Sequence, residues 1–264
     1  MPDGVLDPVQ LGVAFLAAFL AAAINSVAGG GTLVSFPVLV WLGLPSIVAN
    51  ATSTIGIWPG SLGSIWGFRR ELAKVDRRLL WLTIPCFAGG AAGALLLRAT
   101  SARVFDALVP FLVLLATGLF AVRGQVQRWL GGKGQQATAG GPARVNLAVA
   151  MLPILAVGVY GGYFGAGMSI MMLSTLGVLG LTDILEMNAL TSLFALCVNG
   201  VAIALFIAAG LVYWPFVAVM AVGSLLGGYG AAGLARRIGK QAVSRFVLVV
   251  GFTVSALFFL RRFS

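Results

Sequence analysis

The chain has 264 residues, of which 60% are hydrophobic and only 9% are charged. A soluble domain carries about 25% charged residues, so this composition and a mean hydropathy of +1.04 indicate an integral membrane protein. The hydrophobic runs are continuous rather than alternating, which predicts spanning helices and argues against a transmembrane barrel. The formal net charge of +10 does not indicate nucleic-acid binding, because the basic residues lie between hydrophobic runs.

The residue inventory argues against enzymatic chemistry. There is no histidine, which removes most metal sites, Ser-His triads and haem ligation. Cys86 and Cys197 lie in apolar runs without CxxC spacing, so they are interpreted as small hydrophobic residues. We therefore expect a non-enzyme without a cofactor. Residues 1–10 lack the basic n-region of a signal peptide, so the first hydrophobic helix is expected to be retained.

Ten hydrophobic segments are predicted along the chain. The second and the seventh have 12 residues each, which as helices would extend about 18 Å against a hydrocarbon core of about 30 Å. They are expected to be half-spanning helices. Each follows a Gly-rich break, the first at Asn25–Thr32 and the second at Gly161–Met168. The predicted segments are Leu11–Ala28, Thr32–Gly43, Ser46–Phe68, Leu79–Leu97, Val104–Val122, Val145–Phe164, Met168–Leu179, Ile184–Ala209, Tyr213–Ala235 and Ala242–Leu260.

The segments divide into two halves. Residues 1–123 form a predicted first transmembrane repeat, 124–143 a flexible cytoplasmic linker rich in Gly and Gln, and 144–264 a second repeat. With the N-terminus outside, 13 of the 17 Lys and Arg residues fall inside, so the positive-inside rule favours both termini outside. Because each half has an odd number of segments, the halves must have opposite orientations.

The two halves also match in sequence. Gly29-Gly-Gly-Thr aligns with Gly165-Ala-Gly-Met, and Asn50-Ala-Thr-Ser-Thr aligns with Asn188-Ala-Leu-Thr-Ser. Gly89-Gly-Ala-Ala-Gly93 aligns with Gly223-Ser-Leu-Leu-Gly227, and these GxxxG stretches are expected to be packing seams. An all-α membrane protein with two inverted-topology repeats and interrupted helices is a transporter architecture.

The stretches Ala28-Gly-Gly-Gly-Thr, Phe36-Pro-Val-Leu, Leu42-Gly-Leu-Pro and Ala49-Asn-Ala-Thr-Ser resemble the TauE/SafE family of sulfite exporter-like transporters. The second Gly-rich break and Asn188-Ala-Leu-Thr-Ser also resemble that family's repeat, so the resemblance covers nearly the whole chain. It implies a bacterial inner-membrane transporter of small sulfur-containing anions such as sulfite, thiosulfate or a sulfonate.

The substrate site is predicted at the two breaks. Each break ends in a helix N-terminus, whose unpaired N–H groups and dipole favour an anion. Polar stripes follow on the next full-length segment of each half, with residues at i, i+4 and i+11 sharing one helix face. Asn25 and Tyr163 flank the breaks and could equally pack or line a cavity. The predicted site comprises Gly29, Gly30, Gly31, Thr32, Ser35, Asn50, Thr54, Gly165, Gly167, Ser169, Asn188, Thr191, Ser192 and Asn199.

The leading hypothesis is therefore an exporter of a small sulfur-containing oxyanion that works by alternating access at a midplane site between the repeats. No carboxylate lies deep in a predicted helix, where a cation-coupled transporter usually has one; Glu186 is the one candidate for a gate or proton site. The partners expected are a small anion and the lipid bilayer. An anion channel, a carrier of a carboxylate or phosphonate and a non-transporting scaffold remain open alternatives, and the sequence does not indicate an oligomeric state.

Overall fold

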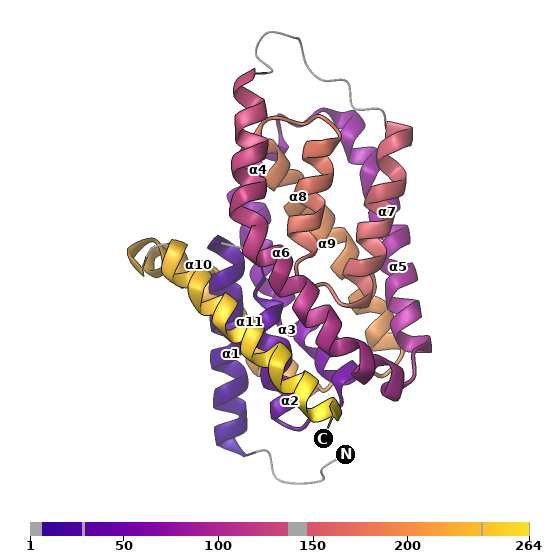
Figure 1. Ribbon diagram of the computed structural model, residues 1–264, viewed down its shortest axis with the longest axis vertical. Coiled ribbons are helices and arrows are strands. Elements are labelled where there is room, and N and C mark those ends of the chain that lie inside the picture. Colours follow the sequence, from indigo (N-terminus) through magenta and orange to yellow (C-terminus); the bar gives the residue numbers. More distant parts are fainter. Residues whose placement is uncertain (1–6, 28–29, 137–146, 239, 264) are drawn as a thin grey trace.

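The structure is a computed structural model that describes residues 7–27, 30–136, 147–238 and 240–263 (Figure 1). These residues are helical almost throughout, which confirms the predicted all-α class. The first half contains α1 (Pro8–Val27), α2 (Thr32–Trp41), α3 (Ser46–Gly67), α4 (Arg69–Leu72), the 3-10 helix η1 (Arg77–Leu82), α5 (Thr83–Ala99) and α6 (Ala102–Gln136). The second half contains α7 (Leu147–Tyr163), α8 (Met168–Val178), α9 (Ile184–Ala208), α10 (Trp214–Ile238) and α11 (Lys240–Phe263).

The composition of these helices suits a membrane. Among the described residues, four helical stretches are long and apolar enough to cross one, namely Pro8–Asn25, Arg77–Ala99, Ala102–Val126 and Ile184–Ala208. Large apolar side chains cover the outside of the bundle; Trp41, Leu152 and Val178, for example, are more than 70% exposed. A soluble protein rarely exposes so much apolar surface. The chain is therefore an integral membrane protein.

The two predicted 12-residue segments form helices that are slightly shorter than expected. α2 has 10 residues and α8 has 11, so each extends about 15 Å, half of a hydrocarbon core. Both end in the same C-terminal turn, in which Gly43 or Gly180 adopts a positive φ and the next N–H donates to a carbonyl five residues earlier. In Figure 1, α2 lies in the lower part of the molecule and α8 in the upper part.

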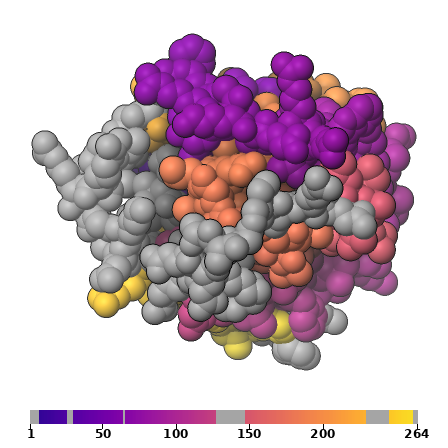
Figure 2. All heavy atoms as spheres, turned by 90° about the horizontal axis from the view of Figure 1, so that it is seen from above, coloured from indigo at the N-terminus to yellow at the C-terminus, as the bar shows by residue number. Residues whose placement is uncertain are grey.

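One predicted boundary is wrong. The sequence places a flexible linker at residues 124–143, but α6 continues as a helix through Gln136; residues 137–143 lie outside the described ones. Gly124 therefore does not interrupt the helix, because a single glycine costs only about 1 kcal/mol relative to alanine in a helix interior. The loop after α3 likewise contains α4, which packs against α9, and η1, which packs against α7 and α5; both lie at the end of the molecule shown in Figure 2.

Helices of one half pack on helices of the other. α10 packs against α1 and α3, and α5 packs against α7 and α9. Glycines bring the backbones close: a Cβ added to Gly89 would lie 2.6 Å from the Leu155 carbonyl oxygen, and one added to Gly227 would overlap the Phe19 carbonyl oxygen. These glycines are thus packing seams, as predicted.

These contacts correct the sequence alignment of the third pair of motifs. Leu155 and Phe19 both lie 12 residues before the N-cap glycine of a half-helix, and they contact Gly89 and Gly227 respectively. The contacts therefore match Gly89 with Gly227, one helical turn away from the Gly223 that the sequence comparison chose. Repeated Gly-rich sequence offers several similar registers, and only packing selects one. The inverted orientation of the halves stays a prediction.

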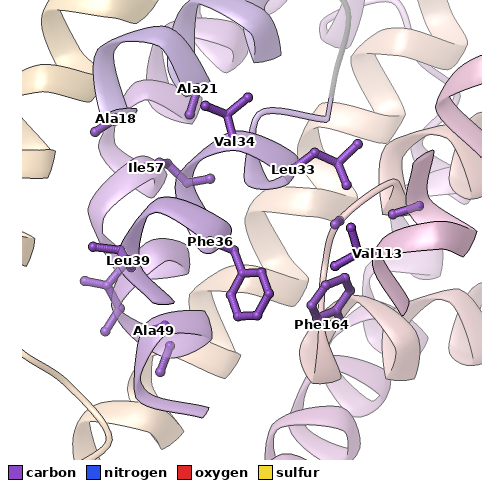
Figure 3. Packing of buried hydrophobic residues seen from close by; sticks show 14 of the residues in the cluster. Ala18, Ala21, Leu33, Val34, Phe36, Leu39, Ala49, Ile57, Val113 and Phe164 are labelled. Carbon is purple, nitrogen blue, oxygen red and sulfur yellow. The ribbon is translucent and has the colours of Figure 1, made fainter. Parts of the chain in front are cut away.

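The main hydrophobic core surrounds the two breaks (Figure 3). Phe36 of α2 lies 5.4 Å, centroid to centroid, from Phe164 of the second break, with the rings edge to face. Leu33, Val34 and Val113 belong to the same buried cluster. Burial of this kind contributes about 25 cal/mol per Å² of apolar surface, so the breaks are held in place by packing on both sides.

Candidate functional site

A small cavity lies where the two breaks meet the middle of α3 and α9. Its volume is about 110 Å³, and because one water occupies about 30 Å³ of liquid, it has room for a few heavy atoms. Both halves contribute to it. Its lining residues are Asn25, Gly30, Thr32, Thr54, Ile57, Trp58, Ser61, Gly165, Gly167, Met168, Ser169, Ser192, Ala195 and Asn199.

The cavity is polar but uncharged. Among the described residues that line it, none is Asp, Glu, Lys or Arg, whereas hydroxyl and amide side chains come from both halves. Within the described parts of the chain, no group of three or more Cys, Asp and Glu residues could hold a metal ion. The site can therefore offer hydrogen bonds and helix-terminal dipoles to a ligand.

Polar bonds hold the first break. Gly30 has a φ of +90°, which glycine adopts readily. The N–H of Gly31, the N-cap of α2, donates to Asn25 Oδ1 at 2.7 Å. One turn further, the Ser35 and Ser53 hydroxyl oxygens lie 2.7 Å apart and tie α2 to α3. The start of α2 is thus fixed by side chains of α1 and α3.

The second break is held differently. Gly165 and Gly167 have φ values of +81° and +78°. The Tyr160 hydroxyl donates to the Ala166 carbonyl at 2.7 Å and pins the loop from α7. The Met168 side chain lies directly against Gly161, so this break presents a thioether where the first presents Thr32.

Some residues of the polar stripes on α3 and α9 line the cavity. Thr54 and Ser61 line it from α3, and Ser192 and Asn199 line it from α9. The Thr54 hydroxyl lies 2.9 Å from the Asn50 carbonyl oxygen, and the Ser192 hydroxyl lies 2.9 Å from the Asn188 carbonyl oxygen. These two hydroxyls occupy matching positions and must rotate if they are to donate to a ligand.

Eight of the predicted site residues line the cavity: Gly30, Thr32, Thr54, Gly165, Gly167, Ser169, Ser192 and Asn199. Gly29 lies outside the described residues. Gly31 packs its Cα against the Ala21 carbonyl instead of facing the cavity, and Ser35 is fully buried.

The other three predicted residues lie on the stripes but not on the cavity wall. Asn50 donates from Nδ2 to the Tyr163 carbonyl at 3.1 Å, which links α3 to the end of α7. Asn188 donates to the Ile184 carbonyl of its own helix at 2.7 Å. The Thr191 Oγ1 is buried and has no partner among the described residues. In this structure the amide of each stripe asparagine donates to a backbone carbonyl, and Asn50 Oδ1 is buried without a partner among the described residues.

Some lining residues were not predicted as site residues, above all Trp58. Tryptophans of membrane proteins are enriched at the membrane interface, and Trp41, Trp66, Trp81 and Trp214 are exposed. Trp58 instead lines the cavity, and its Nε1 is buried without a partner among the described residues. Its position four residues after Thr54, on the polar stripe, was the signal. Ile57, Met168 and Ala195 carried no comparable signal.

Apolar helices around a small uncharged polar cavity are an arrangement suited to carrying a solute across a membrane. A family model described as sulfite exporter TauE/SafE matches residues 14–258. The chain belongs to this family and is a membrane transporter, which confirms the resemblance seen in the sequence.

The relatives carry similar descriptions. A probable membrane transporter protein of Haemophilus influenzae is 29% identical over 93% of both chains. The probable membrane transporter protein YfcA of Escherichia coli K12 is 30% identical over 96% of this chain and 90% of its own. The probable membrane transporter protein ORF9 of a Sinorhizobium species is 27% identical over 91% of this chain and 89% of its own. No solved structure matches.

Proposed function

We propose that the protein exports a small sulfur-containing oxyanion, such as sulfite, thiosulfate or an organosulfonate, across the bacterial inner membrane. The observation that carries the proposal is the uncharged cavity to which both Gly-rich breaks contribute. Its size suits a compact ion of a few heavy atoms. The family description supports a sulfur oxyanion as the cargo.

The starts of the two half-helices supply the chemistry of binding. Thr32 and Ser169 lie in the first turns of α2 and α8, and both line the cavity. The helix dipole favours negative charge at this place, and hydroxyl and amide groups complete the coordination. Several N–H groups at these helix starts, among them those of Gly31, Leu33 and Ile170, already donate to protein acceptors. Because no lysine or arginine lines the cavity within the described part of the chain, a singly charged anion such as hydrogen sulfite or a sulfonate fits better than a dianion such as thiosulfate.

The packing supports alternating access. The cavity lies between two sets of helices that make matching contacts, α1 and α3 with α10, and α7 and α9 with α5. In our proposal these sets rock against each other about the cavity, with both termini outside and the basic loops inside. Export of a monoanion from a cell that is negative inside is downhill by about 2.3 kcal/mol per 100 mV, so efflux needs no coupling carboxylate.

Flux into proteoliposomes tests the proposal. Labelled sulfite, thiosulfate and methanesulfonate are offered with an imposed potential to the wild type and to Asn199→Ala. We expect saturable, potential-sensitive flux of at least one anion. Asn199→Ala should lower that flux by about tenfold, which corresponds to the loss of one charge-assisted hydrogen bond worth about 1.5 kcal/mol.

Ser255→Ala is the matched control, because the buried Ser255 hydroxyl bonds the Gly251 carbonyl of its own helix, away from the cavity. It should leave flux unchanged. Folded protein that carries none of the three anions would refute the sulfur-oxyanion assignment. Conductance far above the turnover of a carrier would identify a channel instead.

A further inference from the structure

The strongest unassigned feature of the cavity is Asn25, the α1 residue that caps the start of α2. Its Oδ1 accepts the Gly31 N–H at 2.7 Å. A backbone N–H can only donate, so the amide oxygen must face Gly31, and this contact fixes the orientation of the whole amide. The Nδ2 group, which has two N–H bonds, is directed elsewhere.

The side chain of Asn25 also lines the cavity. Among the residues that the structure describes, no acceptor pairs with its Nδ2. An amide that has its oxygen occupied and its donors unpaired, next to a cavity, is a preorganised hydrogen-bond donor. We propose that Asn25 Nδ2 donates directly to the transported anion and sets its orientation, an inference that rests on the proposed function.

The second break has no residue that corresponds to the Asn25 donor, so only the first break can donate to the anion in this way. Gly161 occupies the position that matches Asn25, six residues before the N-cap glycine of its half-helix. The Met168 side chain lies over Gly161, so an apolar thioether replaces both the amide and the hydroxyl of the first break. The charged end of the anion therefore binds at the first break, and its other end faces Met168.

Trp58 strengthens this asymmetry. Its Nε1 is a donor that cannot accept, it is buried without a partner in the described structure, and its ring belongs to the cavity wall. Leaving such a donor unpaired is costly. An anion oxygen held by Asn25 would supply an acceptor for this N–H.

Asn25→Asp separates a contact with the anion from a purely structural role. An aspartate has nearly the same shape and still accepts the Gly31 N–H, and a carboxylate is favourable at a helix start. If Asn25 only caps α2, the carboxylate keeps the cap and acts on the anion only through its charge, and folded Asn25→Ala should carry the anion as the wild type does. If Nδ2 donates to the anion, the variant replaces a donor with a negative acceptor.

The probe is labelled methanesulfonate, which keeps one negative charge over the accessible pH range. We expect Asn25→Asp to melt in detergent close to the wild type but to carry methanesulfonate at least tenfold more slowly at neutral pH. Its flux should recover on acidification, because the protonated carboxyl regains an O–H donor, whereas the flux of the wild type should change little.

Two further variants complete the test. Asn25→Ala removes the donor without adding charge, so it should also lose at least tenfold in flux and show no recovery at low pH. Ser53→Ala loosens α2 by removing the bond to Ser35 but leaves the cavity intact; it should lower the melting temperature without changing the KM for methanesulfonate.

Wild-type flux in Asn25→Asp at neutral pH, or in folded Asn25→Ala, would overturn the inference and leave the proposed function standing. A wild type that neither carries sulfite or methanesulfonate nor is stabilised by them would overturn both.

Discussion

The two Gly-rich breaks solve the same backbone problem with different side chains. Each stops a long apolar helix, turns through glycine and starts a half-helix at the cavity. The first is held by the Asn25 amide and by the Ser35–Ser53 hydrogen bond, and the second by the Tyr160 hydroxyl and by Met168 packed on Gly161. The comparison teaches that two breaks with the same backbone arrangement can carry different side chains. A ligand with two different ends can therefore bind more strongly at one break than at the other.

The largest difference should come from adding one methyl group to each N-cap glycine. In Gly31→Ala the new Cβ would overlap the Ala21 carbonyl of α1, so we expect a loss of about 3 kcal/mol or more, or no folded protein. In Gly167→Ala the nearest atom is 3.4 Å away, so only the left-handed backbone costs energy, about 1–2 kcal/mol. Thermal unfolding in detergent measures both, and equal losses would show that the close approach at Gly31 is unimportant.

The free-energy cost of Gly→Ala should differ less between the two packing seams than between the two breaks. Gly89→Ala and Gly227→Ala each press a Cβ against a carbonyl of the partner helix, so each should cost about 1–3 kcal/mol. Gly118→Ala is the control, because a Cβ at Gly118 meets nothing within 4 Å. A neutral result at one seam and a large one at the other would show that the matched contacts of the two halves are not energetically equivalent.

Removing one hydroxyl from each break should loosen that break alone. Tyr160→Phe breaks the bond to the Ala166 carbonyl, and Ser35→Ala breaks the bond to Ser53; each should cost about 1 kcal/mol. Hydrogen exchange should rise in residues 164–170 for the first variant and in 31–37 for the second. Faster exchange at both breaks in either variant would mean that the two breaks open together.

The smallest effect should come from Thr191→Val. Its buried Oγ1 has no partner in the described structure, so an apolar group of the same shape should be neutral or stabilise slightly. The matching residue of the first half, Ser53, has a partner, and Ser53→Ala should cost about 1 kcal/mol. A clear loss of melting temperature in Thr191→Val would reveal a hydrogen bond that forms in another state of the transporter.

Much of the fold follows from local sequence. Continuous apolar runs require helices because the backbone must satisfy its own hydrogen bonds in lipid. A Gly-Leu pair follows α2 and α8 and marks the end of each helix. The predicted end of the fifth segment at Val122 is wrong, because glycines within a helix weaken it without breaking it, and α6 continues to Gln136. The predicted register of Gly89 failed because repeated small residues permit several registers.

The candidate site was predictable where backbone geometry defines it. The glycines and the first residues of the half-helices had to lie at the breaks, and Gly30, Thr32, Gly167 and Ser169 line the cavity. Helix periodicity placed Thr54 and Asn199 on the correct face. It did not distinguish them from Asn50 and Asn188, since a shared face does not specify which residue reaches a cavity and which reaches a neighbouring carbonyl.

The sequence by itself determined the membrane class and the position of each break, because hydrophobic length and glycine act locally along the chain. It also predicts two matching halves. Only the tertiary structure decided which side chains surround the cavity. Trp58 lines the cavity although Trp41, Trp66, Trp81 and Trp214 are exposed, and the Asn25 amide is oriented by a backbone N–H six residues away. The first choice depends on which helices pack beside α3, and the second on how the break folds back against α1; neither contact leaves a periodic trace in the sequence.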